Sequence, residues 1–161
     1  MPFIAGPYTG VYNSLALGQC EDGYTLDFAG RYEEVTGDNF AESVQELIWR
    51  GANMFLSMTL LEYNSAAAAS AFWPWAAFGT IGQVGRVVTS AIGGNPALAK
   101  TTVLTAVAGT TATGTPATLT TAFSILAPNM NISMIFAPRL RRVPIRFQCL
   151  PNTNGVLIAL T

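Results

Sequence analysis

The sequence predicts a mainly β protein, built as an antiparallel β-sandwich or barrel with one flanking α-helix and an extended arm and flap. One long segment, Trp49–Tyr63, alternates in polarity with the period of a β-strand. Short β-rich segments near the C-terminus are separated by turn residues at the spacing of a sandwich or barrel. An alanine-rich segment directly after Tyr63 has the features of a short helix. We expect a single domain over residues 1–161, long enough for a hydrophobic core.

The rest of the chain is organised around this central strand and the helix that follows it. Asn64 or Ser65 can cap a helix running through Ala66–Ala69 to about Trp73, because a side-chain oxygen there accepts from the first free amides. Pro74 then ends the helix. Side chains alternate between the two faces of a strand, which places four apolar residues of the central strand on one face: Met54, Leu56, Met58 and Leu60.

The N-terminal region, residues 1–19, is predicted to be an extended arm. It carries no charge and is interrupted repeatedly by glycine and proline, which disfavour a helix. Its aromatic residues, Tyr8 and Tyr12 among them, would pack either on the protein's own sheet or on a neighbouring molecule. Glu21-Asp22-Gly23 predicts a turn, and Tyr24–Phe28 alternates like a half-buried strand.

The middle of the chain is predicted to be broken into short pieces. Ala29-Gly30 is expected to interrupt the chain before Arg31–Val35, and residues 40–50 to form a loop with a short strand. Residues 79–108 are expected to form a flap or long hairpin, in which Arg86–Ile92 pairs with Thr101–Ala108. The segment Leu119–Ala127 fits either a strand or a short helix. Three further strands are expected: Ile132–Phe136, Val143–Cys149 and Val156–Leu160.

Charge is scarce and unevenly distributed. Only 11% of the residues are charged, against roughly 25% in ordinary soluble domains, so we expect partners to cover much of the surface. All nine acidic residues lie between positions 21 and 62, where only Arg31 and Arg50 offset them, which leaves −7. From residue 63 onward there are six basic residues and no acid. The two halves would attract each other either within one molecule or between copies.

The residue inventory argues against an enzyme and against a bound cofactor. The chain contains no histidine, so it lacks the commonest general base. It also lacks a common zinc ligand, and we expect no zinc site. Cys20 and Cys149 form no CxxC motif, so we expect two free thiols. Neighbouring acids such as Glu33 and Glu34 point to opposite faces of an extended chain and do not converge on one atom. We expect no catalytic, cofactor-binding or metal-binding residues.

No membrane span is expected. The stretch 63–85 carries no charge, but polar residues, glycines and a proline interrupt it and no positive cluster flanks it.

Basic residues near the C-terminus are the main candidates for a contact surface. They would grip a phosphate or carboxylate or, the favoured reading, form a basic edge that pairs with the acidic half, within the chain or between chains. The hypothesis of a subunit interface covers Arg139, Arg141, Arg142, Arg146, Tyr8 and Tyr12.

Several stretches resemble the tail tube and related virion proteins of tailed bacteriophages. The resemblance lies in the general pattern over most of the chain. It is carried by Glu21-Asp22-Gly23-Tyr24, Gly37-Asp38, Arg50-Gly51 before the long strand, its end Leu61-Glu62-Tyr63, Leu126-Ala127-Pro128, and the segment from Arg142 to Pro151.

The resemblance implies a β-sandwich or barrel with a flanking helix that assembles as hexameric rings stacked into a hollow DNA conduit. The partners would be further copies of the chain, a tape-measure protein and a sheath or terminator protein. The location would be the virion tail, assembled in the host cytoplasm. Glu33, Glu34 and Asp38 would face the lumen, where negative charge keeps DNA from adhering. The alternatives are a neck or tail-terminator ring protein, and a monomeric β-sandwich that binds carbohydrate or protein.

Overall fold

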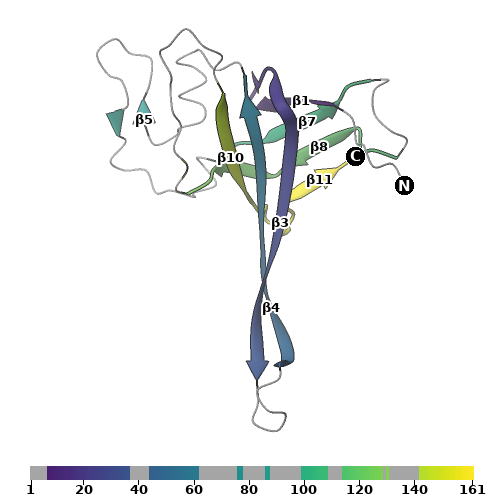
Figure 1. Ribbon diagram of the computed structural model, residues 1–161, viewed down its shortest axis with the longest axis vertical. Coiled ribbons are helices and arrows are strands. Elements are labelled where there is room, and N and C mark those ends of the chain that lie inside the picture. Colours follow the sequence, from purple (N-terminus) through teal and green to yellow (C-terminus); the bar gives the residue numbers. More distant parts are fainter. Residues whose placement is uncertain are drawn as a thin grey trace.

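The computed structural model describes residues 7–36, 44–61, 76–77, 86–87, 99–108, 114–128, 130 and 142–161 (Figure 1). The regular structure of these residues is β-strand throughout, and every pairing is antiparallel. The protein is therefore mainly β, as predicted. The helix expected from Ala66–Ala69 to Trp73 and the strand expected over Ile132–Phe136 lie outside the described residues.

One sheet has five strands in the order β11-β8-β7-β1-β2. Its strands are β1 (Tyr8–Tyr12), β2 (Leu15–Ala16), β7 (Thr102–Ala106), β8 (Thr118–Thr121) and β11 (Ile158–Leu160). The second sheet has four strands in the order β3-β4-β10-β9. They are β3 (Cys20–Thr36), β4 (Val44–Leu60), β10 (Val143–Leu150) and β9 (Phe123–Leu126). A separate pair joins β5 (Ala76–Ala77) to β6 (Arg86–Val87).

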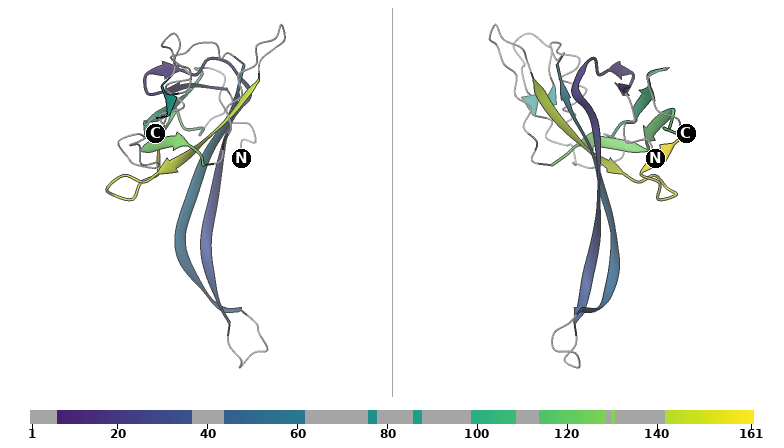
Figure 2. Two further views of the ribbon diagram at one scale, coloured as in Figure 1. Left: turned by 90° about the vertical axis from the view of Figure 1, so that its left-hand side faces the viewer. Right: turned by 45° about the vertical axis from the view of Figure 1, so that its right-hand side comes forward.

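The strands β3 and β4 form a hairpin that is far longer than any other element. Each strand has 17 residues, so each spans about 55 Å at the usual rise per residue. The base of the hairpin belongs to the four-stranded sheet, because β4 pairs with β10 only from Met54 to Leu60. Beyond Met54 the two strands pair with each other alone and project from the body of the protein (Figures 1 and 2).

Three local breaks expected from the sequence are absorbed into this hairpin. Glu21-Asp22-Gly23 is a bulge inside β3 and not a turn: Asp22 and Gly23 are extra residues with φ of 59° and 75°. Ala29-Gly30 continues the strand, since it pairs with Asn53 and Ala52. Residues 40–50 were expected to form a loop with a short strand, and from Val44 onward they belong to the long strand β4. Cross-strand hydrogen bonds therefore override the local turn signals.

The predicted pairing of Arg86–Ile92 with Thr101–Ala108 is wrong. Strand β7 is hydrogen-bonded to β1 along one edge and to β8 along the other, so both of its edges are occupied. Arg86 and Val87 instead pair with Ala77 and Ala76. The remainder of the expected flap lies outside the described residues.

The described part of the N-terminal arm is built into the protein's own sheet. Strand β1 pairs with β7 over its whole length, and the turn Asn13-Ser14 returns the chain to β2. Gly10 lies under Tyr24 of the other sheet, where a Cβ would overlap the tyrosine hydroxyl. The sequence left open whether the arm packs on its own sheet or on a neighbouring molecule, and Tyr8–Tyr12 packs on its own sheet.

The core is one hydrophobic cluster to which both sheets contribute. Fully buried Tyr12 of β1 stacks on fully buried Phe147 of β10, with ring centroids 4.6 Å apart and planes 8° from parallel. The predicted apolar face of β4 is confirmed at Leu56, Met58 and Leu60, which are at most 4% exposed. The predicted strand Val143–Cys149 is confirmed as β10, and its apolar positions alternate with exposed ones.

A buried hydroxyl cluster joins the two sheets beside this core. Thr102 Oγ1 and Ser124 Oγ lie 2.6 Å apart, and the Thr121 hydroxyl donates to Ser124 Oγ at 3.3 Å. Ser124 Oγ donates onward to the carbonyl of Lys100 at 2.6 Å. Because each of these buried hydroxyls has a partner, the cluster links the sheets without the cost of an unpaired polar group.

Candidate functional site

The hairpin carries a row of exposed apolar side chains that begins opposite Met54 at its base and runs along the projecting part. We call this row, made of Phe28, Tyr32, Leu47 and Trp49, the apolar strip. Their exposed fractions are 62%, 58%, 56% and 51%. Residues directly opposite each other in an antiparallel pair share a face, and Phe28 faces Met54, Tyr32 faces Trp49 and Glu34 faces Leu47. The strip therefore continues the apolar face that forms the core at the base of the hairpin.

A bulge at Arg50 brings Trp49 onto this face. The pairing steps from Arg31↔Gly51 to Tyr32↔Trp49, so Arg50 is the extra residue of β4. Gly51 provides the backbone angle for it, with φ of 113°. Strict alternation counted from Met54 would have placed Trp49 on the other face. Sequence reasoning missed the strip for this reason, and the only available signal was Arg50-Gly51 inside a strand.

The two aromatic rings at the middle of the strip are ordered by contact with each other and with a glycine. Tyr32 and Trp49 meet edge to face, with centroids 5.0 Å apart and an angle of 73°. A Cβ at Gly30 would lie 2.8 Å from Trp49 Cζ3, so the indole rests directly over the backbone at this point. The strip thus presents a preformed aromatic surface to the outside.

The opposite face of the hairpin carries charged side chains, and three arginines pair with carboxylates of the same chain beside it. Both Nε and Nη2 of Arg50 donate to one carboxylate oxygen of Glu33. Nearer the body, Arg142 Nη2 lies 2.8 Å from Glu21 Oε1, and Arg146 Nη2 lies 3.7 Å from Asp27 Oδ2.

The predicted interface arginines therefore divide into two groups. Arg142 and Arg146 bind carboxylates of their own chain, and the Arg146 guanidinium also sits 4.1 Å from the centre of the Phe55 ring. Arg139 and Arg141 lie outside the described residues. At the two described positions, the acidic and basic halves meet within one molecule. The Arg142 and Arg146 side chains are 61% and 44% exposed, so each pair contributes at most about 1 kcal/mol to stability.

The two tyrosines proposed for the interface occupy different environments. The Tyr12 ring is 0% exposed, so it belongs to the core of its own chain and offers no surface to a neighbour. This position corrects its inclusion in the interface, and the reason is the pairing of β1 with β7. Tyr8 is half-buried, and its hydroxyl donates to the carbonyl of Pro116 at 2.7 Å.

The acids proposed to face a lumen lie on opposite faces of β3. Glu33 is on the charged face, bound to Arg50, while Glu34 is on the face of the apolar strip and opposite Leu47. Asp38 lies outside the described residues. Glu33 and Glu34 therefore do not point to the same side of the hairpin.

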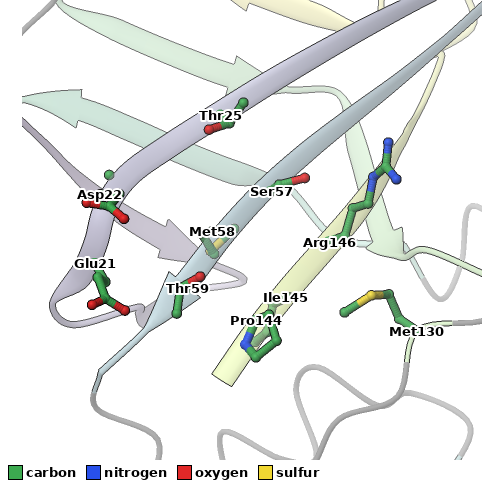
Figure 3. Close-up of a pocket in the computed structure, with 11 residues that line it drawn as sticks. Glu21, Asp22, Thr25, Ser57, Met58, Thr59, Met130, Pro144, Ile145 and Arg146 are labelled. Carbon is green, nitrogen blue, oxygen red and sulfur yellow. The ribbon is translucent and has the colours of Figure 1, made fainter. Parts of the chain in front are cut away.

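A shallow cavity of about 320 Å³ lies on the sheet at the base of the hairpin (Figure 3). Glu21 and Asp22 stand at one end, and Arg146 and Met130 stand at the other. Glu21 and Arg146 are each engaged in an ion pair, and between them the lining consists of hydroxyls and apolar groups. Within the described lining, titratable groups do not converge on a common point, so this cavity lacks the arrangement that acid–base catalysis needs.

Among the described residues, no group of three potential metal ligands comes together, and no helix is long and apolar enough to span a membrane. Cys20 and Cys149 are both free thiols, as predicted.

Burial raises the pKa values of the titratable groups in the core. Desolvation raises the pKa of the Cys149 thiol from 9.0 to about 11 and that of the Tyr12 hydroxyl from 10.0 to about 12. A raised pKa in the folded state means that stability is fully present below the unfolded-state pKa and is lost as the pH rises through the folded-state value.

Stability is therefore expected to fall as the pH rises from 9 toward 11. Urea denaturation at a series of pH values would show the loss, on the order of 1–3 kcal/mol. Cys149→Val should reduce the loss that begins near pH 9, to which the Cys20 thiol also contributes because burial raises its pKa, and should leave the part due to Tyr12. A free energy of unfolding that stays constant across this interval would contradict the assignment.

No protein family model matches the chain, and no curated protein matches its sequence.

Proposed function

We propose that this protein is a structural subunit that assembles with copies of itself into rings, stacked as the tail tube of a tailed bacteriophage. In this proposal the two sheets form a sandwich with a flanking helix, the assembly is a hexameric ring, and its lumen conducts DNA. The protein would reside in the virion tail and contact a tape-measure protein and a sheath or terminator protein. It would act without catalytic residues or cofactor, and the acids Glu33, Glu34 and Asp38 remain candidates for the lumen wall.

The apolar strip on the projecting hairpin is the observation that carries the proposal. Four large apolar side chains, each more than half exposed, lie together on a segment that the described body does not cover. Soluble monomers rarely expose contiguous apolar surface of this kind, whereas interfaces are enriched in Trp, Tyr and Phe. A neighbouring copy that covered the strip would remove this surface from water.

The internal ion pairs determine which forces would hold such an assembly together. Because Arg142 and Arg146 are matched by carboxylates of their own chain, copies do not need each other to neutralise these charges. We infer that apolar contact at the strip, and not salt-bridge exchange, provides most of the association energy. Assembly should then persist at high ionic strength, where contacts between exposed charges are screened.

A monomeric binding module is the alternative from another class. It would need a concave recognition surface, and the cavity at the hairpin base is shallow, with its Glu21 and Arg146 side chains already held in ion pairs. A neck or tail-terminator ring is the alternative within the virion, and it would use the same strip in a ring that does not stack.

The proposal is tested by the assembly state of the purified wild-type chain. Size-exclusion chromatography with light scattering, at low and high salt, should show a species much larger than 17.0 kDa, and negative-stain microscopy should show tubes or stacked rings. Rings that never stack would favour the neck or terminator. A single small species at every concentration would refute self-assembly.

A further inference from the structure

The loop between β10 and β11 holds the only Asn-Gly sequence in the chain, Asn154-Gly155. Both residues are exposed, and Gly155 adopts a φ of 77°. Glycine has no side chain to shield its backbone nitrogen, so that nitrogen can reach the side-chain amide of the preceding asparagine. Among asparagine sequences, this one is chemically the most open to loss of its amide.

Asn152 holds this loop closed through its side chain and its backbone. Its Oδ1 accepts from the backbone N–H of Asn154 and from that of Val156, each at 2.9 Å. Its carbonyl accepts from the N–H of Gly155 at 3.0 Å. We call these three bonds the Asn152 clamp. They hold the residues on both sides of the Asn154–Gly155 peptide bond in place. One of them also engages the N–H proton of Gly155, which the backbone nitrogen must lose in order to react.

We propose that Asn154 is a site of spontaneous deamidation whose rate is set by opening of the Asn152 clamp. In the open loop, water or hydroxide removes the Gly155 N–H proton, and the nitrogen attacks Cγ of Asn154. The new N–Cγ bond closes a succinimide ring, and the side-chain nitrogen leaves as ammonia. Water then adds to one of the two ring carbonyls and yields either aspartate or isoaspartate. The reaction involves no oxidation or reduction and needs no reagent other than water.

The modification would change the molecule in two ways. Either product adds one carboxylate to a chain whose net charge is −1. The isoaspartate product also lengthens the backbone by a methylene between β10 and β11. Because β11 is an edge strand paired only with β8, a longer connection would loosen its attachment without disturbing the core. This inference does not depend on the proposed function.

The test is peptide mapping by mass spectrometry after incubation of the full-length protein at mildly alkaline pH. Deamidation at Asn154 is compared in native wild type, in urea-denatured wild type, in Asn152→Ala and in Asn152→Asp. Asn13, which precedes Ser14 in an exposed turn, serves as an internal control in every digest. The aspartate variant keeps an oxygen acceptor for the two N–H groups, whereas the alanine variant has none.

We expect the native wild type to deamidate at Asn154 more slowly than the denatured chain, on the order of tenfold for a modest opening free energy. Asn152→Ala loses the two side-chain bonds of the clamp and keeps the backbone bond to the Gly155 N–H, so its rate should rise above that of native wild type toward the denatured rate. Asn152→Asp should stay near wild type and Asn13 should not change. Equal rates in native wild type and Asn152→Ala would overturn the role of the clamp. So would an equal acceleration in both variants, or a parallel rise at Asn13. Absence of deamidation at Asn154 even in the denatured chain would overturn the site itself.

Discussion

Replacing Phe28 with glutamate is expected to prevent assembly while leaving the fold intact. Phe28 is the most exposed member of the apolar strip, at 62%, so the substitution removes little packing within the monomer and should change its stability by no more than about 0.5 kcal/mol. In an assembled state, the same position would bury an unpaired carboxylate. That cost is expected to weaken association by at least about 100-fold, as for an interface hot spot. Light scattering measures the shift from the large species to a monomer.

Ile48→Glu provides the matched control. Ile48 lies on the same hairpin, farther from the body, and is 39% exposed, but it pairs with Glu33 on the charged face. It therefore tests whether any added carboxylate on the hairpin blocks assembly or whether only one on the strip does. We expect Ile48→Glu to assemble nearly as well as wild type. If Phe28→Glu assembled like wild type with an unchanged circular dichroism spectrum, the strip would not be the contact surface.

Replacing Phe147 with alanine is expected to cause the largest loss of stability. Its ring is fully buried, stacks on Tyr12 and joins the two sheets in one core. Truncation of a buried phenylalanine costs about 3–5 kcal/mol, because it combines lost transfer energy with a residual cavity. Since domains are typically stable by only about 5–15 kcal/mol, much of the margin would disappear. Urea denaturation followed by circular dichroism gives the free energy of unfolding.

Two variants frame the interpretation of this loss. Phe147→Leu keeps an apolar side chain and should cost clearly less than alanine. Phe55→Ala removes the same ring from the half-buried outer face of β4, where it packs against Arg146, and should cost roughly 1 kcal/mol. If Phe147→Ala were no more destabilising than Phe55→Ala, the stacked pair would not be the centre of the core.

The strands with the clearest alternation could be located from the sequence. Val143–Leu150 places its apolar residues on every second position, and Leu56, Met58 and Leu60 do the same in β4. Alternation is a property of neighbouring residues, so a single sequence contains it. Turn residues were less informative: Asp22-Gly23 has the backbone of a turn but serves as a bulge in a continuous strand. The positive φ angle was predictable from the residue types. Whether it would produce a turn or a bulge depended on the pairing of β3 with β4.

The candidate site was the part that sequence reasoning could not assemble. The search for charged groups led to the C-terminal arginines, and the two that are described bind their own chain's carboxylates. The strip was missed because the strand beginning at Tyr24 was expected to break at Ala29-Gly30, and because strict alternation places Trp49 on the other face. Both errors arise from one cause, since hairpin length and bulge position follow from the register between two strands.

By itself, the amino-acid sequence determined that this chain is mainly β and that Phe147 alternates with polar neighbours in its strand, and it indicated two free cysteines. These outcomes depend on periodicity, which involves only neighbouring residues, and on composition, which is counted over the whole chain. Both can be read from a single sequence. Only the tertiary structure decided that β7 pairs with β1 and β8, that Tyr12 is enclosed, and that Trp49 joins Tyr32 on an exposed face. Those outcomes depend on which distant segments share hydrogen bonds, and the free energies of competing pairings differ too little for local preference to select among them.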